Sequence, residues 1–267
     1  MIISQTDRMV YKIEESGRSF ITHWFINMLA ALKDVDLSEK IDVCFDLDFT
    51  KESYQKESLD ILSDIINVVP NTSDAVFLKS NKTINSINGG GFHKDPRSYV
   101  FLRELFLSRI ENNFDTTGYE KIYIRRNKSH LCEGNVFENS IRRRQIVNED
   151  EFVEKLKEQG IKSIYFEDYS VSEKIQIFNK ASLVVSPQSG GLVFSLFANP
   201  KCKIVEILPP NPHQYCDQYL SICRALDIDY YRFSNVMKVD GNDNMSVPVE
   251  TLSKFVEDYY AQDNSTN

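Results

Sequence analysis

Residues 182–210, SLVVSPQSGGLVFSLFANPKCKIVEILPP, contain the pattern that decides the fold of this 267-residue chain. The short apolar runs 183–186 and 203–208 are typical of buried strands, and 190–198 between them has the composition of a helix. A connection that only reverses the chain needs no pair of adjacent glycines at the start of that helix. Such a pair lets the backbone approach a ligand, and the first N–H groups of a helix attract a diphosphate. Close packing of the strand on the helix is the alternative, and the glycines alone do not decide between the two.

The same alternation continues on both sides of this stretch. We expect further strands at 121–124, 163–166 and 229–233, and further helices at 148–159, 172–179, 215–226 and 248–260. This order predicts a parallel sheet with helices on both faces. The first part of the chain alternates less regularly, with expected helices at 20–32, 58–68 and 99–110 and strands at 41–45 and 75–78. The fold class is therefore α/β, with two Rossmann-like domains at 1–117 and 118–267. The last helix either caps the second domain or crosses back to the first.

Composition limits the class of protein. The chain carries a net charge of −8 and is 42% hydrophobic, so it is expected to be globular and not to bind nucleic acid over a broad surface. Its five cysteines form no CxxC pair, which favours reduced thiols and a cytoplasmic location. We also expect no signal peptide and no membrane span, because no apolar stretch approaches 18 residues.

Arginines gather around one loop of this acidic chain. Two of them follow the strand at 121–124, and three more stand together before the helix at 148–159: Arg125, Arg126, Arg142, Arg143 and Arg144. The planar fork of arginine suits phosphate oxygens, so the cluster is a candidate diphosphate site. The alternative is a solvated charged loop whose partners are Glu133, Glu138 and Glu149. We favour a role in binding for Arg126, because it directly follows the apolar strand. For the run Arg142 to Arg144 considered alone, we favour the solvated loop.

Together these motifs resemble the family 61 glycosyltransferases, of the type found in capsular polysaccharide biosynthesis. The matching residues keep the family's order: His23-Trp24, Leu102 to Phe106, Tyr123 to Arg126, Arg143-Arg144, Asn148 to Glu151, Ala181 to Pro187, Gly190 or Gly191 with Leu192, and Val205 to Ile207. Several ordered motifs over roughly residues 120–210 are more specific than a single glycine pair.

The resemblance implies two facing Rossmann-like domains, the GT-B arrangement. It implies inverting transfer of a hexosyl or pentosyl group from a nucleotide sugar, usually a UDP-sugar, to a glycan or glycoprotein hydroxyl. No metal is obligatory in this scheme. The second domain is expected to hold the nucleotide and the first domain the acceptor.

The same resemblance assigns the donor-binding residues. These are Arg126, Arg143, Arg144, Gln188, Ser189, Gly190, Gly191 and Glu206, with Glu206 accepting hydrogen bonds from a ribose. An N-cap or salt-bridge role for Glu206 is equally open. Gln188 stands where the family has His, so it can still donate hydrogen bonds but carries no charge.

An inverting transfer needs a base for the acceptor hydroxyl. His23 is the first candidate, and His93 with Asp95 in a glycine-rich loop is the second. A hydrogen-bonded core histidine and a plain surface turn are the respective alternatives. The family often has an acidic residue shortly after His-Trp, whereas this chain has Asn27.

Two other functions are left open. Asp46 and Asp48 spell an Asp-x-Asp motif after a strand, which would hold Mg²⁺ or Mn²⁺ in a metal-dependent transferase, although a solvated turn is the simpler explanation. The replacements at Asn27 and Gln188 also suit a glycosyltransferase-like binding subunit without catalytic activity.

Overall fold

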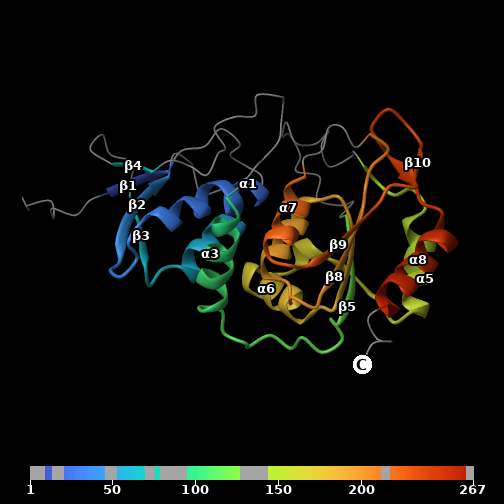
Figure 1. Ribbon diagram of the computed structural model, residues 1–267, viewed down its shortest axis with the longest axis horizontal. Helices are drawn as coiled ribbons and strands as arrows, with labels where there is room; N and C mark the ends of the chain where they lie inside the picture. The colour runs from blue at the N-terminus through green and yellow to red at the C-terminus, as the bar shows by residue number, and fades with distance from the viewer. Residues whose placement is uncertain are drawn as a thin grey trace, which may run out of the picture. The chain divides into compact units, whose positions relative to one another are not determined.

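The structure is a computed structural model of the chain, and it describes residues 10–13, 21–45, 53–69, 76–78, 95–126, 144–211 and 217–262. The chain divides into two compact units, Met1–Glu111 and Asn112–Asn267. Both units are mixed α/β structures built on a parallel sheet (Figure 1).

The first unit contains a four-stranded parallel sheet in the order β3-β2-β1-β4. Its strands are β1 (Val10–Ile13), β2 (Ile41–Phe45), β3 (Ile66–Val68) and β4 (Val76–Leu78). These are the first four positions of the Rossmann strand order 3-2-1-4-5-6. The central strand β1 was absent from the sequence prediction, because its polar surroundings hide a run of only four residues.

Helical segments connect these strands. One continuous segment runs through α1 (Ile21–His23), the π-helical η1 (Trp24–Met28) and the 3₁₀ helix η2 (Leu29–Asp34). Its inner face is fully buried, and Trp24 Nε1 donates to Ser58 Oγ at 2.7 Å. The helices α2 (Ser53–Ile61) and α3 (Pro96–Leu107) complete the unit.

The helix expected at 58–68 is wrong in its second half. Helix α2 ends at Ile61, a turn follows, and β3 begins at Ile66. The apolar positions 62, 65 and 66 fit a helical period, but Ile66 pairs with Ile41 in the sheet instead. Tertiary pairing therefore overrides the local pattern here.

The second unit contains a five-stranded sheet in the order β6-β5-β7-β8-β9, and all its neighbouring strands run parallel. The strands are β5 (Lys121–Arg125), β6 (Lys162–Tyr165), β7 (Leu183–Pro187), β8 (Lys203–Ile207) and β9 (Asp229–Phe233). Numbered from β5, this is the 2-1-3-4-5 order of flavodoxin-like sheets. The strands expected from the sequence are confirmed within a residue or two.

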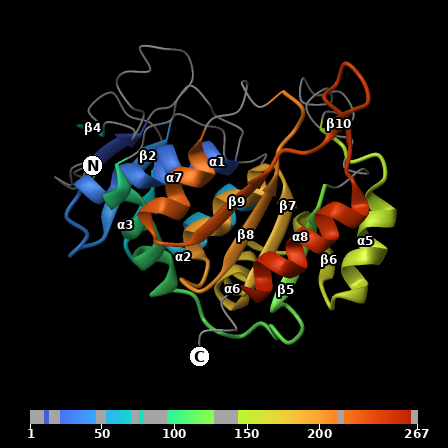
Figure 2. The same ribbon diagram turned by 45° about the vertical axis from the view of Figure 1, so that its right-hand side comes forward.

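Helices cover both faces of this sheet, as expected. Figures 1 and 2 show α5 (Glu149–Glu158) and α8 (Val249–Ala261) on one face, and α6 (Val171–Lys180) and α7 (Gln218–Ala225) on the other. The short 3₁₀ helices η3 (Phe166–Asp168) and η4 (Gly190–Phe197) complete the second layer. Helix α6 begins with a capping box in which Ser170 and Glu173 bond each other's backbone N–H groups.

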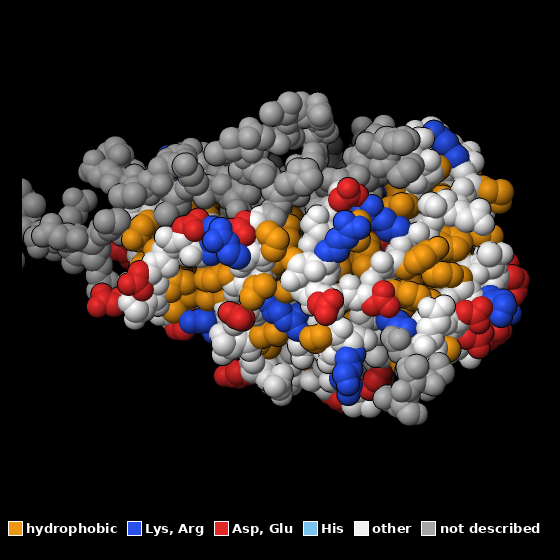
Figure 3. All heavy atoms as spheres, viewed as in Figure 1, with side chains coloured by type: hydrophobic (Ala, Val, Ile, Leu, Met, Phe, Trp, Pro, Cys, Tyr) orange, Lys and Arg blue, Asp and Glu red, His pale blue; other side chains and the backbone are white. Residues whose placement is uncertain are grey.

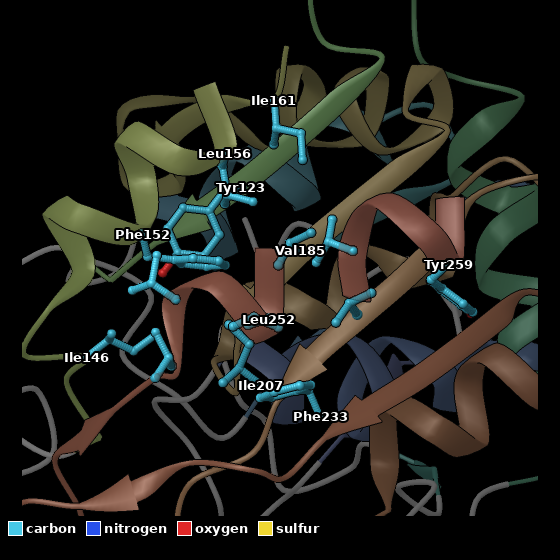
Figure 4. Packing of buried hydrophobic residues seen from close by; sticks show 14 of the residues in the cluster. Tyr123, Ile146, Phe152, Leu156, Ile161, Val185, Ile207, Phe233, Leu252 and Tyr259 are labelled. Carbon is cyan, nitrogen blue, oxygen red and sulfur yellow. The ribbon is translucent and has the colours of Figure 1, made fainter. Parts of the chain in front are cut away.

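One part of the core of the second unit lies between the sheet and the α5–α8 layer (Figure 4). Strand alternation sends Tyr123, Val185 and Ile207 to this side. There Tyr123 meets Phe152 edge-on, with ring centroids 5.3 Å apart, and Leu252 of α8 covers the neighbouring strands. Helix α8 thus packs its buried side chains on the core of the second unit.

A small hairpin lies between β9 and α8. Its strands are β10 (Met237–Lys238) and β11 (Met245–Ser246), which pair antiparallel, and Ile146 forms a parallel bridge with Met245. The sequence did not predict these strands, because each has only two residues.

The distribution of charge on the surface and the state of the cysteines can be compared with what the composition predicts. Acidic and basic side chains are interspersed on the described part of the face shown in Figure 3. Cys44, Cys202 and Cys223 are buried free thiols. No helix among the described residues has both the length and the apolar character needed to cross a bilayer.

Candidate functional site

The second sheet changes direction between two adjacent strands. From β5 the chain adds β6 on one side, then returns to add β7, β8 and β9 on the other. In open parallel sheets of this kind, ligands bind outside the carboxyl ends of the strands at such a switch point. Here those ends are Arg125 of β5 and Pro187 of β7.

Two arginines converge on the turn that follows β7. Arg126 Nη1 donates to the carbonyl oxygen of Gln188 at 2.9 Å, and Arg144 Nη1 lies 3.3 Å from Gln188 Oε1. Arg126, Arg144 and the turn therefore share one end of the sheet. Two guanidinium groups thus lie beside the same turn, and this arrangement suits an anionic ligand.

Gln188 is the residue on which these contacts centre. It is 5% exposed, and its backbone N–H donates to Ile207 O at 3.1 Å. Its backbone carbonyl and side-chain oxygen accept from the two arginines, while its amide also approaches the Glu206 carboxylate. A neutral amide can serve both neighbours because it donates and accepts at once.

Glu206 lies beneath this turn and is 0% exposed. The register places it between Ser186 of β7 and Arg232 of β9, with Arg232 Nε 3.3 Å from Oε2. Burial raises the pKa of Glu206 above its ordinary value, and the nearby Tyr230, Arg232 and Gln188 only partly oppose that rise. The carboxylate thus faces an ion-pair partner inside the fold, which is the salt-bridge role that the sequence left open, and direct contact with a ribose stays a prediction.

Arg232 links this buried carboxylate to the surface. Its Nη1 donates to Asp217 Oδ1 at 2.6 Å, so one guanidinium joins a buried and an exposed carboxylate. Neither Glu206 oxygen forms a hydrogen bond of regular geometry within the described part of the chain, although Arg232 lies within ion-pair distance. Glu206 is thus buried next to a cation, but the effect of burial on its pKa outweighs that charge.

The helix after the turn is a 3₁₀ helix, η4, which begins at Gly190. Ser189 precedes it in an extended conformation and makes no capping hydrogen bond through its side chain. A Cβ built on Gly191 would lie 3.0 Å from Cδ1 of Phe166, so a larger residue here would have to displace the Phe166 ring. Close packing, the alternative explanation of the glycine pair, thus has support at Gly191, and ligand binding by the pair stays a prediction.

Arg125 has a different environment from its neighbour Arg126. Its guanidinium contacts Glu149 at 3.1 Å and Asp150 at 2.6 Å, and Tyr123 donates to the same Glu149 at 2.8 Å. Arg125 therefore forms structural ion pairs. Glu149 is one of the partners that the alternative explanation of the arginine cluster named.

His23, the first candidate base, is in the first unit at the end of α1. Its Nδ1 lies 2.8 Å from Nδ2 of the fully buried Asn27, one helical turn later. Asn27 thus occupies the position from which an acidic residue would orient the imidazole. An amide is a weaker orienting group than a carboxylate, because it can either donate to Nδ1 or, after rotation, accept from it.

Asp95, the second candidate, caps helix α3. Its Oδ1 accepts from the Arg97 backbone N–H at 3.0 Å, and Arg97 Nη2 lies 2.7 Å from Oδ2. The hydrogen bonds and charge of Arg97 lower the pKa of Asp95, which makes this carboxylate a poorer proton acceptor. The remaining candidates, His93, Arg143, Asp46 and Asp48, lie outside the described residues.

Sequence reasoning missed several residues around this site. Arg232 and Tyr230 of β9 lie next to Glu206, and Asp217, just before α7, binds Arg232. Only the register of β8 with β9 brings Arg232 beside Glu206, and no local signal in the sequence states that register. Within the described residues, no group of three or more His, Cys, Asp or Glu side chains is arranged to hold a metal ion.

Comparisons with known proteins identify one family. A family model described as Glycosyltransferase 61 matches residues 21–205, which include His23, Arg126 and Gln188. A search of the curated proteins found no match.

Proposed function

The chain belongs to the glycosyltransferase 61 family, and from this we propose that it transfers a sugar from a nucleoside diphosphate donor, most often a UDP-sugar, to an acceptor hydroxyl with inversion. The sugar is a hexosyl or pentosyl group, and the acceptor is a glycan, such as a capsular polysaccharide, or a glycoprotein. The proposal assigns the donor to the second unit and the acceptor to the first unit, in the two-domain GT-B arrangement that the family resemblance implies.

One observation carries the donor assignment: Arg126 and Arg144 both contact Gln188 at the switch point of the second sheet. When the glycosidic C1–O bond breaks, its electron pair moves to the β-phosphate oxygen and the diphosphate gains negative charge. Guanidinium groups and the N–H groups at the start of η4 stabilise that charge without needing a cation. Arg143, Ser189, Gly190 and Gly191 complete the proposed diphosphate site.

Gln188 organises this site in place of the family's histidine. Its carbonyl and amide oxygens bind one arginine each, so the two positive charges are held at a fixed separation before the donor arrives. Preorganised charge stabilises a transition state more than charge that must first be gathered. Glu206 supports this arrangement from below through the Gln188 amide, and a ribose contact would require the amide to move.

His23 is the proposed base on the acceptor side. It removes the proton of the attacking hydroxyl while the acceptor oxygen bonds to C1 and the diphosphate leaves, so one proton passes to the imidazole in each turnover. This requires Nε2 to be unprotonated. In the structure Asn27 Nδ2 faces Nδ1, so the amide of Asn27 must rotate before its oxygen can accept a hydrogen bond from Nδ1–H. His93 stays a second candidate, and Asp95 is less suited because it caps α3.

The test measures UDP release from a panel of UDP-sugars, with and without glycan acceptors, in excess chelator and again with Mg²⁺ or Mn²⁺. We expect release in chelator that increases with the correct acceptor. UDP release that occurs only with added metal would instead favour the metal-dependent transferase that uses Asp46 and Asp48. UDP binding without any donor breakdown over the whole panel would instead favour the binding-subunit alternative.

A further inference from the structure

The turn of the β10–β11 hairpin holds the backbone of Arg144. We propose that Asn244, supported by Asp240, is a positioning residue that sets the place of the Arg144 guanidinium at the donor diphosphate. This inference rests on the proposed function, because it assumes that Arg144 binds the donor. It adds an element outside the matched region, since the hairpin follows residue 205.

Four hydrogen bonds join the hairpin to residues 144–147. Arg144 N donates to Asn242 O at 3.1 Å, and Gln145 N donates to the side-chain Oδ1 of Asn244 at 2.8 Å. Met245 N donates to Gln145 O at 2.8 Å, and Val147 N donates to Met245 O at 2.9 Å. The backbone N–H groups of Arg144, Gln145 and Val147 thus all donate to the hairpin, so the hairpin determines where this segment lies.

Arg144 has a backbone conformation that needs such support. Its φ is 63°, in the left-handed region that residues other than glycine rarely adopt. This conformation is strained for a residue with a Cβ. The bonds to Asn242 and Asn244 on either side of that backbone offset the strain and select the direction in which the side chain leaves the chain.

The hairpin turn is itself well fixed. Asp240 accepts from the backbone N–H groups of Asn242 at 2.8 Å and Asn244 at 3.2 Å, and from the Asn244 side-chain Nδ2 at 2.8 Å. These bonds lower the pKa of Asp240, so the carboxylate stays ionised at neutral pH. Asn211, just after β8, donates to Asp243 at 2.6 Å and ties the turn to the sheet. Asn244 is therefore oriented by Asp240 before it reaches Gln145.

The hairpin also covers part of the core, but Asn244 does not carry that role. Met245 and Val247 are buried in the cluster below α8, whereas the contacts of Asn244 are polar and directed at Gln145 and Asp240. A replacement of Asn244 therefore tests the positioning of Arg144 without removing a side chain from the core.

The experiment is a double-mutant cycle in the full chain, with UDP as the probe and calorimetry as the readout. Arg144→Gly removes the guanidinium while tolerating the left-handed backbone, and it should weaken UDP binding by about tenfold or more. Asn244→Ala should weaken it by about three- to tenfold in the wild-type background. In the Arg144→Gly background, Asn244→Ala should have no further effect, because its action passes through the missing side chain.

Two further variants complete the design. Asn199→Ala also removes a side-chain acceptor from a backbone N–H, that of Lys201 at 2.9 Å, but before the amino end of β8, and should leave UDP binding unchanged. The exchange Asp240→Asn with Asn244→Asp keeps both the acceptor for Gln145 and a bond between positions 240 and 244, and should restore affinity. Thermal unfolding of each variant confirms that it is folded.

The outcomes separate the inference from the proposed function. Wild-type protein that binds no UDP, or an unchanged affinity in Arg144→Gly, overturns the donor site and the inference with it. Weakening by Arg144→Gly with no effect of Asn244→Ala overturns the inference alone. An equal loss from Asn244→Ala in both backgrounds, or no recovery in the exchanged pair, also overturns it, because the residue would then act without Arg144.

Discussion

The replacement Arg126→Ala probes the centre of the proposed donor site. In the wild type its guanidinium donates to the Gln188 carbonyl at 2.9 Å, next to the start of η4. A charge-assisted hydrogen bond to a phosphate contributes about 1.5–3 kcal/mol, so its loss should weaken UDP binding by about 10- to 100-fold.

This effect is large enough for a thermal-shift assay. At 100 times its dissociation constant, a ligand adds about 2.7 kcal/mol to the free energy of unfolding. At the same UDP concentration, the variant should retain only about 0.4–1.4 kcal/mol of that stabilisation. Since 1 kcal/mol corresponds to about 2–4 °C in a chain of this size, the loss is resolved easily.

The matched control is Arg125→Ala, one residue earlier. Arg125 is bound to Glu149 and Asp150, so its removal should lower the melting temperature without ligand and leave the UDP-induced shift intact. Arg125→Lys serves if the alanine variant folds poorly. An undiminished shift in Arg126→Ala, or an equal loss in both alanine variants, would refute the assignment of Arg126.

Three further predictions concern the other candidate residues. Asp95→Asn keeps an N-cap acceptor for α3 and should preserve both stability and transfer, whereas Asp95→Ala should cost about 1 kcal/mol in denaturant unfolding; loss of transfer in the Asn variant would make Asp95 a base after all. Because burial raises the pKa of Glu206, its contribution to stability is present below the unfolded pKa and falls as the pH rises toward the folded pKa. Glu206→Gln should remove that dependence, at most about 1.4 kcal/mol per pH unit, and an unchanged pH profile of unfolding would contradict the assignment. Asn27→Asp should increase kcat for sugar transfer with little change in KM, since a carboxylate accepts only from His23 Nδ1–H and leaves Nε2 as the base; a lower kcat would argue against His23.

The second sheet was predictable from the sequence because its inner strands β7 and β8 are fully buried. A strand such as Leu183–Pro187 is apolar on both faces, and turn signals bound it on each side. The first unit was less predictable, since β1 and β3 have only four and three residues and their pairing depends on partners distant in sequence. The helix at 190–198 was predicted, but its 3₁₀ geometry was not.

The site was predictable only in part, for a similar reason. Arg126 and the turn at Gln188 follow neighbouring strands, so strand order alone brings them to one end of the sheet. The ion pair of Glu206 with Arg232 depends on strand register, and the support of Arg144 depends on a hairpin about 100 residues later in the chain. Neither the strand register nor the contact with the distant hairpin can be recognised from a local pattern in the sequence.

The position of α8 has a practical consequence for anyone who trims this protein to its family match. A fragment ending at residue 205 would cut β8 and remove β9 and α8 altogether. Val185 and Val205 would then lie on a bare sheet face, and the buried ammonium of Lys203 would lose the Tyr259 carbonyl that it contacts at 2.7 Å. An open strand edge beside exposed valines promotes aggregation, so expression should extend at least through Ala261.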